Sequence, residues 1–123
     1  MAAARRASSL RWTLLIDRHE DTGTLVLQLT GRLGMTTAAP LEQALDAALR
    51  EPHACVVADL SGVDYVSSAG LSVLERATTR FGEAGRRLVV RSLQEPVAVG
   101  FEVAGAGSRL DLGEAGAITT DGD

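Results

Sequence analysis

Apolar residues recur at regular intervals in the first half of the chain and predict its first three elements. Strand-like runs at 12–16 and 24–29 flank the turn-forming sequence Glu-Asp-Thr-Gly at 20–23, which favours an antiparallel hairpin. Leucines then repeat every four residues, at Leu41, Leu45 and Leu49, which is typical of the buried face of an amphipathic helix over about 38–50.

The second half alternates strands with helices. The run 54–58 is apolar at every position and predicts a central strand buried on both faces. Apolar residues at helical spacing over 71–81 predict a second helix, which Gly82 or Gly85 can end. A short strand at 88–90 and a third helix beginning near Pro96 follow. The alternation predicts right-handed crossovers between parallel strands.

The end of the chain gives weaker signals, at 109–112 and 115–119, which suggest a short edge strand and a frayed end. Loops that follow parallel strands gather at one edge of a sheet, where ligands and partners usually bind. We expect three such loops to form the functional face, at 31–37, 60–70 and 92–96.

Composition indicates one ordinary globular domain. The chain has 123 residues, of which 46% are hydrophobic and 23% charged. All 12 basic residues are arginine, and the absence of lysine excludes a Walker A phosphate loop and Schiff-base catalysis. The single Cys55 lies in a run expected to be buried, which favours a reducing compartment. Since no apolar stretch approaches about 18 residues, we expect no membrane insertion and a cytoplasmic location.

Charge and side-chain chemistry exclude several kinds of ligand. The net charge of −4 and the presence of only four aromatic residues argue against direct nucleic-acid binding. His19 and His53 are far apart and lack metal-ligand spacing to Cys55, and loop positions would account for both. We therefore expect neither a metal nor a cofactor.

Small polar residues concentrate at Ser67-Ser68-Ala69-Gly70, just before the second helix. Capping of that helix by serine is the favoured interpretation from the residues alone. A serine nucleophile would need a nearby base, and the chain has no Gly-x-Ser-x-Gly elbow, so an independent enzyme is not expected. Tyr65, which precedes the cluster, fits either a core aromatic or an exposed contact residue.

The stretch 59–74, with its Ser-Ser-Ala-Gly-Leu core, resembles the signature of the STAS domain, which is shared by anti-sigma factor antagonists and sulfate-transporter tails. The resemblance extends to 29–33 and 101–105 and covers about 13–112. It implies an α/β fold in which a mixed sheet of four to five strands carries helices mainly on one face. We expect a flexible tail at 1–10 and a single domain at 11–123, with the last ten or so residues disordered.

In anti-sigma factor antagonists the pattern before the second helix is Asp, a phosphorylated Ser, a small residue and then Gly-Leu. Matching Gly70-Leu71 to that Gly-Leu makes Ser68 the phosphoacceptor, with Ser67 as the alternative. Ser67 stands where the family has Asp, and Gly34 stands where it often has Asp. The partner-binding residues that the resemblance implies are Gly31, Arg32, Leu33, Gly34, Tyr65, Val66, Ser67, Ser68, Ala69, Gly70 and Leu71.

The resemblance also implies the partners. The unmodified protein would bind an anti-sigma factor that has serine kinase activity and so release a sigma factor for transcription. Phosphorylation of Ser68 would switch this binding off, and a PP2C-type phosphatase would restore it. The alternative is a STAS scaffold or transporter-associated subunit that is never phosphorylated, and Ser67 in place of Asp fits this alternative.

Overall fold

The computed structural model describes residues 14–112, so the tail predicted at 1–10 and the weak segment at 115–119 lie outside it. Across residues 14–112, four strands form one sheet in the order β1-β2-β3-β4. β1 is antiparallel to β2, whereas β2, β3 and β4 run parallel. The strand bounds are β1 (Leu14–Asp21), β2 (Thr24–Leu33), β3 (Cys55–Val66) and β4 (Arg87–Arg91).

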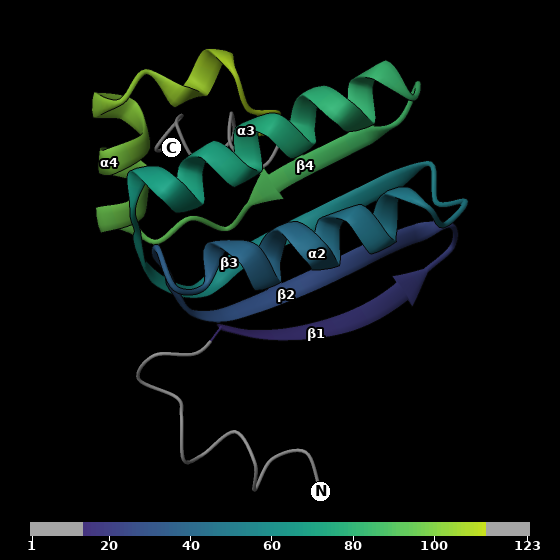
Figure 1. The fold of residues 1–123 in the computed structure, drawn as a ribbon, viewed down its shortest axis with the longest axis horizontal. Helices are drawn as coiled ribbons and strands as arrows, with labels where there is room; N and C mark the ends of the chain where they lie inside the picture. The colour runs from purple at the N-terminus through teal and green to yellow at the C-terminus, as the bar shows by residue number, and fades with distance from the viewer. Residues whose placement is uncertain (1–13, 113–123) are drawn as a thin grey trace, which may run out of the picture.

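Three α-helices accompany the sheet in the described part of the chain: α2 (Ala38–Leu49), α3 (Ser68–Glu83) and α4 (Glu95–Val103), followed by the short 3₁₀ helix η2 (Ala106–Ser108). Figure 1 shows α2 and α3 side by side across one face of the sheet, and α4 at the end where β4 finishes. The predicted mixed sheet with helices mainly on one face is therefore confirmed. Within residues 14–112 no helix has the length and hydropathy needed to span a bilayer.

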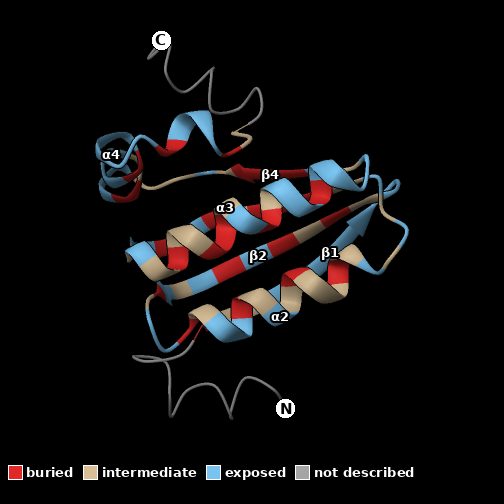
Figure 2. Ribbon diagram, turned by 45° about the horizontal axis from the view of Figure 1, so that its top comes forward, coloured by how far each residue is buried: buried red, intermediate tan, exposed pale blue. Residues whose placement is uncertain are grey.

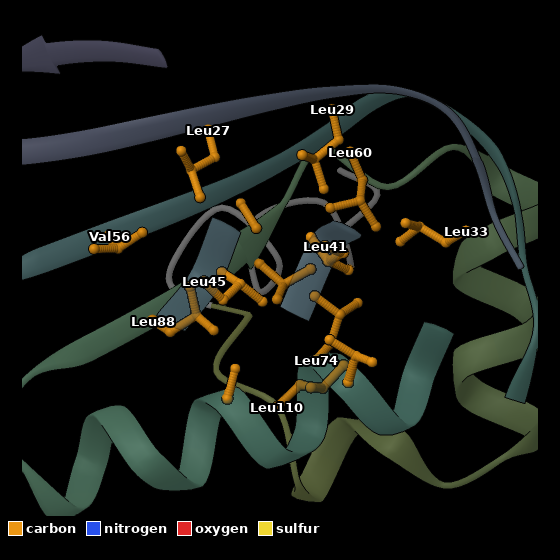
Figure 3. Packing of buried hydrophobic residues seen from close by; sticks show 14 of the residues in the cluster. Leu27, Leu29, Leu33, Leu41, Leu45, Val56, Leu60, Leu74, Leu88 and Leu110 are labelled. Carbon is orange, nitrogen blue, oxygen red and sulfur yellow. The ribbon is translucent and has the colours of Figure 1, made fainter. Parts of the chain in front are cut away.

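The core lies between the sheet and this helical layer (Figures 2 and 3). Leu25, Leu27 and Leu29 alternate along β2, so all three point to the same face, and each is at most 2% exposed. The helices present matching apolar stripes, which include Leu41 of α2 and Leu74 of α3. On the outer side the two helices are joined by the ion pairs Arg76–Glu42 at 3.4 Å and Arg80–Asp46 at 2.6 Å.

The predicted hairpin is present, but β1 extends five residues beyond the predicted run, through Asp21. The turn is only Thr22-Gly23, and both residues have positive φ, +47° and +84°, as primed hairpin turns require. A polar sequence can continue β1 because this strand lies at the edge of the sheet and is largely exposed. His19 consequently lies in a strand, not in the loop we expected.

The predicted loop over 60–70 is wrong for most of its length, since β3 continues to Val66 and α3 begins at Ser68. The turn-like residues mark a β-bulge instead: the register with β2 shifts between the pairs Gln28–Asp59 and Thr30–Gly62. A Cβ on Gly62 would stand 2.7 Å from the Thr30 hydroxyl and 2.8 Å from a backbone oxygen, so the bulge needs glycine.

Other predicted loops are shorter than expected. β2 continues to Leu33, so the connection between β2 and α2 is 34–37. α4 begins at Glu95, so the connection between β4 and α4 is 92–94. These ends still lie at the carboxyl edge of the parallel strands. The predicted edge strand at 109–112 is reduced to one parallel bridge between Val89 and Asp111. Cys55, expected to be buried, is partly exposed at the start of β3.

Candidate functional site

The carboxyl ends of β2 and β3 lie side by side and bring together two segments more than 30 residues apart in sequence. The register pairs Arg32 with Tyr65 and Leu33 with Val66. The Ser67 amide then donates a 2.7 Å hydrogen bond to the Leu33 carbonyl. The pairing joins the two groups of residues for which the family resemblance implied a binding role, 31–34 and 65–71. We call this surface the β2–α3 edge.

The two adjacent serines have different roles at this edge. Ser67 is the N-cap of α3: its backbone is extended, at φ −85° and ψ 174°, and its hydroxyl accepts a 3.2 Å hydrogen bond from the Gly70 amide. Ser68 is the first helical residue and is exposed. Within the described residues its hydroxyl makes no hydrogen bond. Ser68 is therefore accessible to another protein, whereas the Ser67 oxygen already caps the helix.

The helix begins this close to the sheet because residue 70 has no side chain. A Cβ on Gly70 would stand 2.8 Å from the Leu33 oxygen and 2.9 Å from the Leu33 Cβ. Leu33 and Gly70 are buried, and Val66 and Leu71 pack against the core. These four residues thus position the edge more than they form its outer surface.

Arg32 and Tyr65 form the exposed part of the edge. The Arg32 guanidinium carbon lies 4.5 Å from the centroid of the Tyr65 ring, which is the geometry of a cation–π contact. Tyr65 is 43% exposed, so of the two interpretations left open by its sequence the exposed one is correct. The Tyr65 ring lies close to Gly34: a Cβ added to Gly34 would stand 3.8 Å from the Tyr65 Cε2 atom.

Met35, in the connection between β2 and α2, is 82% exposed and adds apolar area next to this edge. Buried Thr37 shapes the connection, because its hydroxyl donates to the Arg32 carbonyl at 2.6 Å and accepts from the Gly34 amide at 2.8 Å. The only sequence signal for Met35 is an apolar residue isolated within a polar turn.

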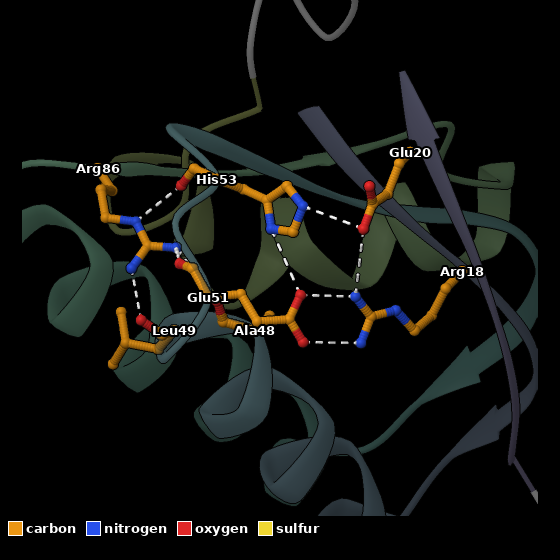
Figure 4. Close-up of polar contacts among 7 residues, drawn as sticks. All are labelled: Arg18, Glu20, Ala48, Leu49, Glu51, His53 and Arg86. Carbon is orange, nitrogen blue, oxygen red and sulfur yellow. Dashed lines mark hydrogen bonds and ion pairs between the residues drawn. The ribbon is translucent and has the colours of Figure 1, made fainter. Parts of the chain in front are cut away.

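A second polar cluster lies at the other end of β3, where the hairpin meets the connection after α2 (Figure 4). Arg18 donates two hydrogen bonds, at 2.7 and 3.0 Å, to the two oxygens of Glu51. These bonds are the main cause of a raised pKa for Arg18 and a lowered pKa for Glu51. His53 lies 3.3 Å from Glu20 and 3.5 Å from Glu51.

Possible metal-ligand atoms of Glu20, Glu51 and His53 lie within 4.8 Å of one another, a juxtaposition that sequence spacing did not indicate. The Arg18 guanidinium already supplies a cation there, 2.7 Å from Glu51 and 3.8 Å from Glu20. The arrangement therefore works as an ion-pair cluster that ties β1 to the connection between α2 and β3.

Comparison with known proteins gives concordant matches. A family model described as Mlab, STAS domain matches residues 16–114. The putative anti-sigma factor antagonist BtrV of Bordetella bronchiseptica is 34% identical over 83 residues, which are 68% of this chain and 72% of BtrV. The anti-sigma-F factor antagonist RsfB of Mycobacterium tuberculosis is 31% identical over 65 residues, or 53% of each chain, so the match spans about half the length of RsfB.

Solved structures share the fold. An anti-sigma factor antagonist from Mycobacterium paratuberculosis superposes with a TM-score of 0.73 at 24% identity, covering 89% of this chain and 95% of the other. The phosphorylated form of the Bacillus cell fate determinant SpoIIAA gives 0.61 at 16% identity, covering 86% of this chain and 98% of the other. Because the family model spans most of the sequence and the match to BtrV covers more than two thirds of either chain, this chain belongs to the STAS domain family.

Proposed function

We propose that this protein is an anti-sigma factor antagonist that binds an anti-sigma factor with serine kinase activity through the β2–α3 edge. The observation that carries the proposal is the exposed Ser68 hydroxyl at the start of α3, held in place by the Ser67–Leu33 hydrogen bond. The names of BtrV and RsfB support the same role. In this role the unmodified protein occupies the anti-sigma factor and so releases a sigma factor.

Phosphorylation of Ser68 is the proposed off switch. The partner kinase transfers the terminal phosphoryl group of ATP to the Ser68 oxygen, whose proton passes to a base of the kinase, and ADP leaves. The product carries about −1.5 to −2 charges at a position that faced the partner. Desolvating that charge at the interface would cost roughly 3–4 kcal/mol and weaken binding several-hundredfold.

The fold should tolerate the phosphate. Ser68 is exposed and occupies the first turn of a 16-residue helix, where amide groups and the helix dipole favour an anion. The switch therefore needs no large internal rearrangement. A PP2C-type phosphatase would reverse it, so this protein is a substrate of regulatory enzymes in the cytoplasm and not itself an enzyme.

The test uses purified anti-sigma factor kinases from the source organism with Mg²⁺ and ATP, and intact-mass analysis of the wild type, Ser68→Ala and Ser67→Ala. We expect one phosphate on the wild type and on Ser67→Ala, and none on Ser68→Ala. Equal uptake by the wild type and Ser68→Ala would refute the assignment of Ser68. Uptake lost only in Ser67→Ala would transfer the role to Ser67.

A second candidate is a STAS scaffold or transporter-associated subunit that is never phosphorylated. The observation that favours it is Ser67, a neutral cap at the position where the phosphorylated pattern has a carboxylate. Stable binding of a partner by the wild type and Ser68→Glu alike, without phosphate uptake from any tested kinase, would support this candidate over the first.

A further inference from the structure

Arg32 differs from most of the arginines in the described part of the chain. Arg18, Arg76, Arg80, Arg87 and Arg109 each contact a carboxylate within 4.0 Å. Arg32 has no such partner among residues 14–112, and its guanidinium lies instead over the Tyr65 ring. Asp64, which precedes Tyr65 in β3, is exposed, and it forms no ion pair with Arg32. A permanent cation is thus held at the β2–α3 edge without a carboxylate partner among the described residues.

We propose that Arg32 receives the phosphate on Ser68, so that modification replaces the contact between Arg32 and Tyr65 with an ion pair inside the same chain. This inference rests on the proposed function, since it concerns the consequence of modifying Ser68. It adds a residue that responds to the phosphate before any partner is present.

Backbone contacts place Arg32 and Ser68 at the same edge of the sheet. Arg32 precedes Leu33 and Ser68 follows Ser67, and the Leu33 carbonyl and Ser67 amide are joined by a 2.7 Å hydrogen bond. Arg32 lies one residue before Leu33 and Ser68 one residue after Ser67, so about 3.8 Å of backbone separates each of them from this hydrogen-bonded pair. The register pairs Arg32 with Tyr65, three residues before Ser68, so the arginine side chain must extend along the strand direction to reach the phosphate. Both residues are exposed, so a long arginine side chain can turn toward the phosphate without opening the core.

The position of the guanidinium also favours this exchange. It lies over the Tyr65 ring, which is close to Gly34, the first residue after β2. A guanidinium binds two phosphate oxygens through parallel N–H groups, and this charge-assisted pairing is stronger than its contact with an exposed aromatic ring.

The exchange would alter two parts of the interface at once. Arg32, once paired with the phosphate, could no longer bind an acidic group of the partner. The Tyr65 ring would also lose the cation that covers it. Phosphorylation would thus remove an existing contact surface as well as adding a negative charge. This explains how a modification at one exposed hydroxyl could weaken binding without changing the fold.

The experiment uses the full chain with phosphoserine incorporated at position 68 during synthesis, so no kinase is needed. The second ionisation of the phosphate is followed by ³¹P NMR against pH, and the Nε–H signal of Arg32 by ¹⁵N NMR. Arg32→Gln is compared with Arg76→Gln, which removes the same charge from an exposed position on α3. Urea unfolding verifies that both variants are folded.

We expect the phosphate in the wild type to ionise about half a pH unit lower than in Arg32→Gln, because a nearby cation favours the dianion. Arg76→Gln should match the wild type, and the Arg32 signal should move as the phosphate ionises. Equal titration curves in the wild type and Arg32→Gln would overturn the inference. If the Arg32 effect is present but the phosphate leaves partner binding unchanged, the proposed function fails and the Arg32 assignment survives.

Discussion

The Leu33 carbonyl is in contact with Gly70 across the junction of β2 and α3: a Cβ on residue 70 would stand only 2.8 Å from that oxygen. The same oxygen accepts the Ser67 amide hydrogen at 2.7 Å. It cannot move away from residue 70 without breaking this bond. One backbone oxygen therefore fixes the start of the helix that presents Ser68.

Gly70→Ala tests this relationship. The added methyl group would collide with backbone and with the Leu33 Cβ, and we expect a loss of about 2–3 kcal/mol in the free energy of unfolding. The matched control is Gly82→Ala in the same helix, where no atom lies within 4 Å of the new Cβ and a gain of about 0.5–1 kcal/mol is expected. Urea unfolding measures both; an equally stable Gly70→Ala would contradict the close contact.

Ser67 should contribute to stability as a cap, independently of phosphorylation. Ser67→Ala removes the acceptor of the Gly70 amide and should cost about 1 kcal/mol. Ser67→Asp keeps an acceptor and adds a negative charge at the helix start, so it should equal or exceed the wild type by about 0.3–1 kcal/mol. Thermal and urea unfolding test this order. If Ser67→Ala were as stable as the wild type, the capping role would be wrong.

Arg86 ties the end of α2 to the connection that leads into β3. Its guanidinium donates to the carbonyls of Ala48, Leu49, Glu51 and His53 (Figure 4). Arg86→Gln should cost about 2–3 kcal/mol, because one amide cannot satisfy these partly buried oxygens. The neighbouring Arg87→Gln removes an exposed ion pair and should cost less than about 1 kcal/mol. Similar losses in the two variants would argue against the special role of Arg86.

The ion pair of Arg18 and Glu51 should make stability depend on pH. The folded state lowers the pKa of Glu51, chiefly through the Arg18 hydrogen bonds, so folding favours the ionised carboxylate. This contribution is present above the unfolded pKa of about 4.3 and is lost as the pH falls below it. The stability difference between wild type and Glu51→Gln should therefore shrink in acid. A difference that is unchanged by acid, or that persists in an Arg18→Gln background, would contradict this.

Tyr65 should matter for binding more than for folding. Because its ring is 43% exposed at the β2–α3 edge, Tyr65→Ala should weaken binding to the proposed kinase partner by about 10- to 100-fold. The free energy of unfolding should change by less than about 1 kcal/mol. Val103→Ala, at a more exposed residue on α4, is the control. Calorimetric titration with the purified kinase measures the affinities, and equal weakening by both variants would refute a specific role for Tyr65.

The sequence predicted elements best where one residue pattern had one structural meaning. The leucines of α2 and the continuous apolar run in β3 did so, and both elements are present. It failed where turn-forming residues occur inside a strand: Ser61 and Gly62 were expected in a loop, yet they lie at a bulge within β3. Local propensity cannot distinguish these cases, because the neighbouring strand decides whether the backbone finds hydrogen-bond partners.

By itself the sequence determined the α/β class, the antiparallel hairpin and the Ser-Ser-Ala-Gly junction, because these depend on periodicity and on residues adjacent in the chain. Only the tertiary structure decided that Ser67 caps while Ser68 is exposed, that Arg32 covers Tyr65, and that Arg18 meets Glu51. The last two contacts join side chains 33 residues apart. Strand register and helix packing bring such distant side chains together, and neither can be predicted from the sequence of one segment alone.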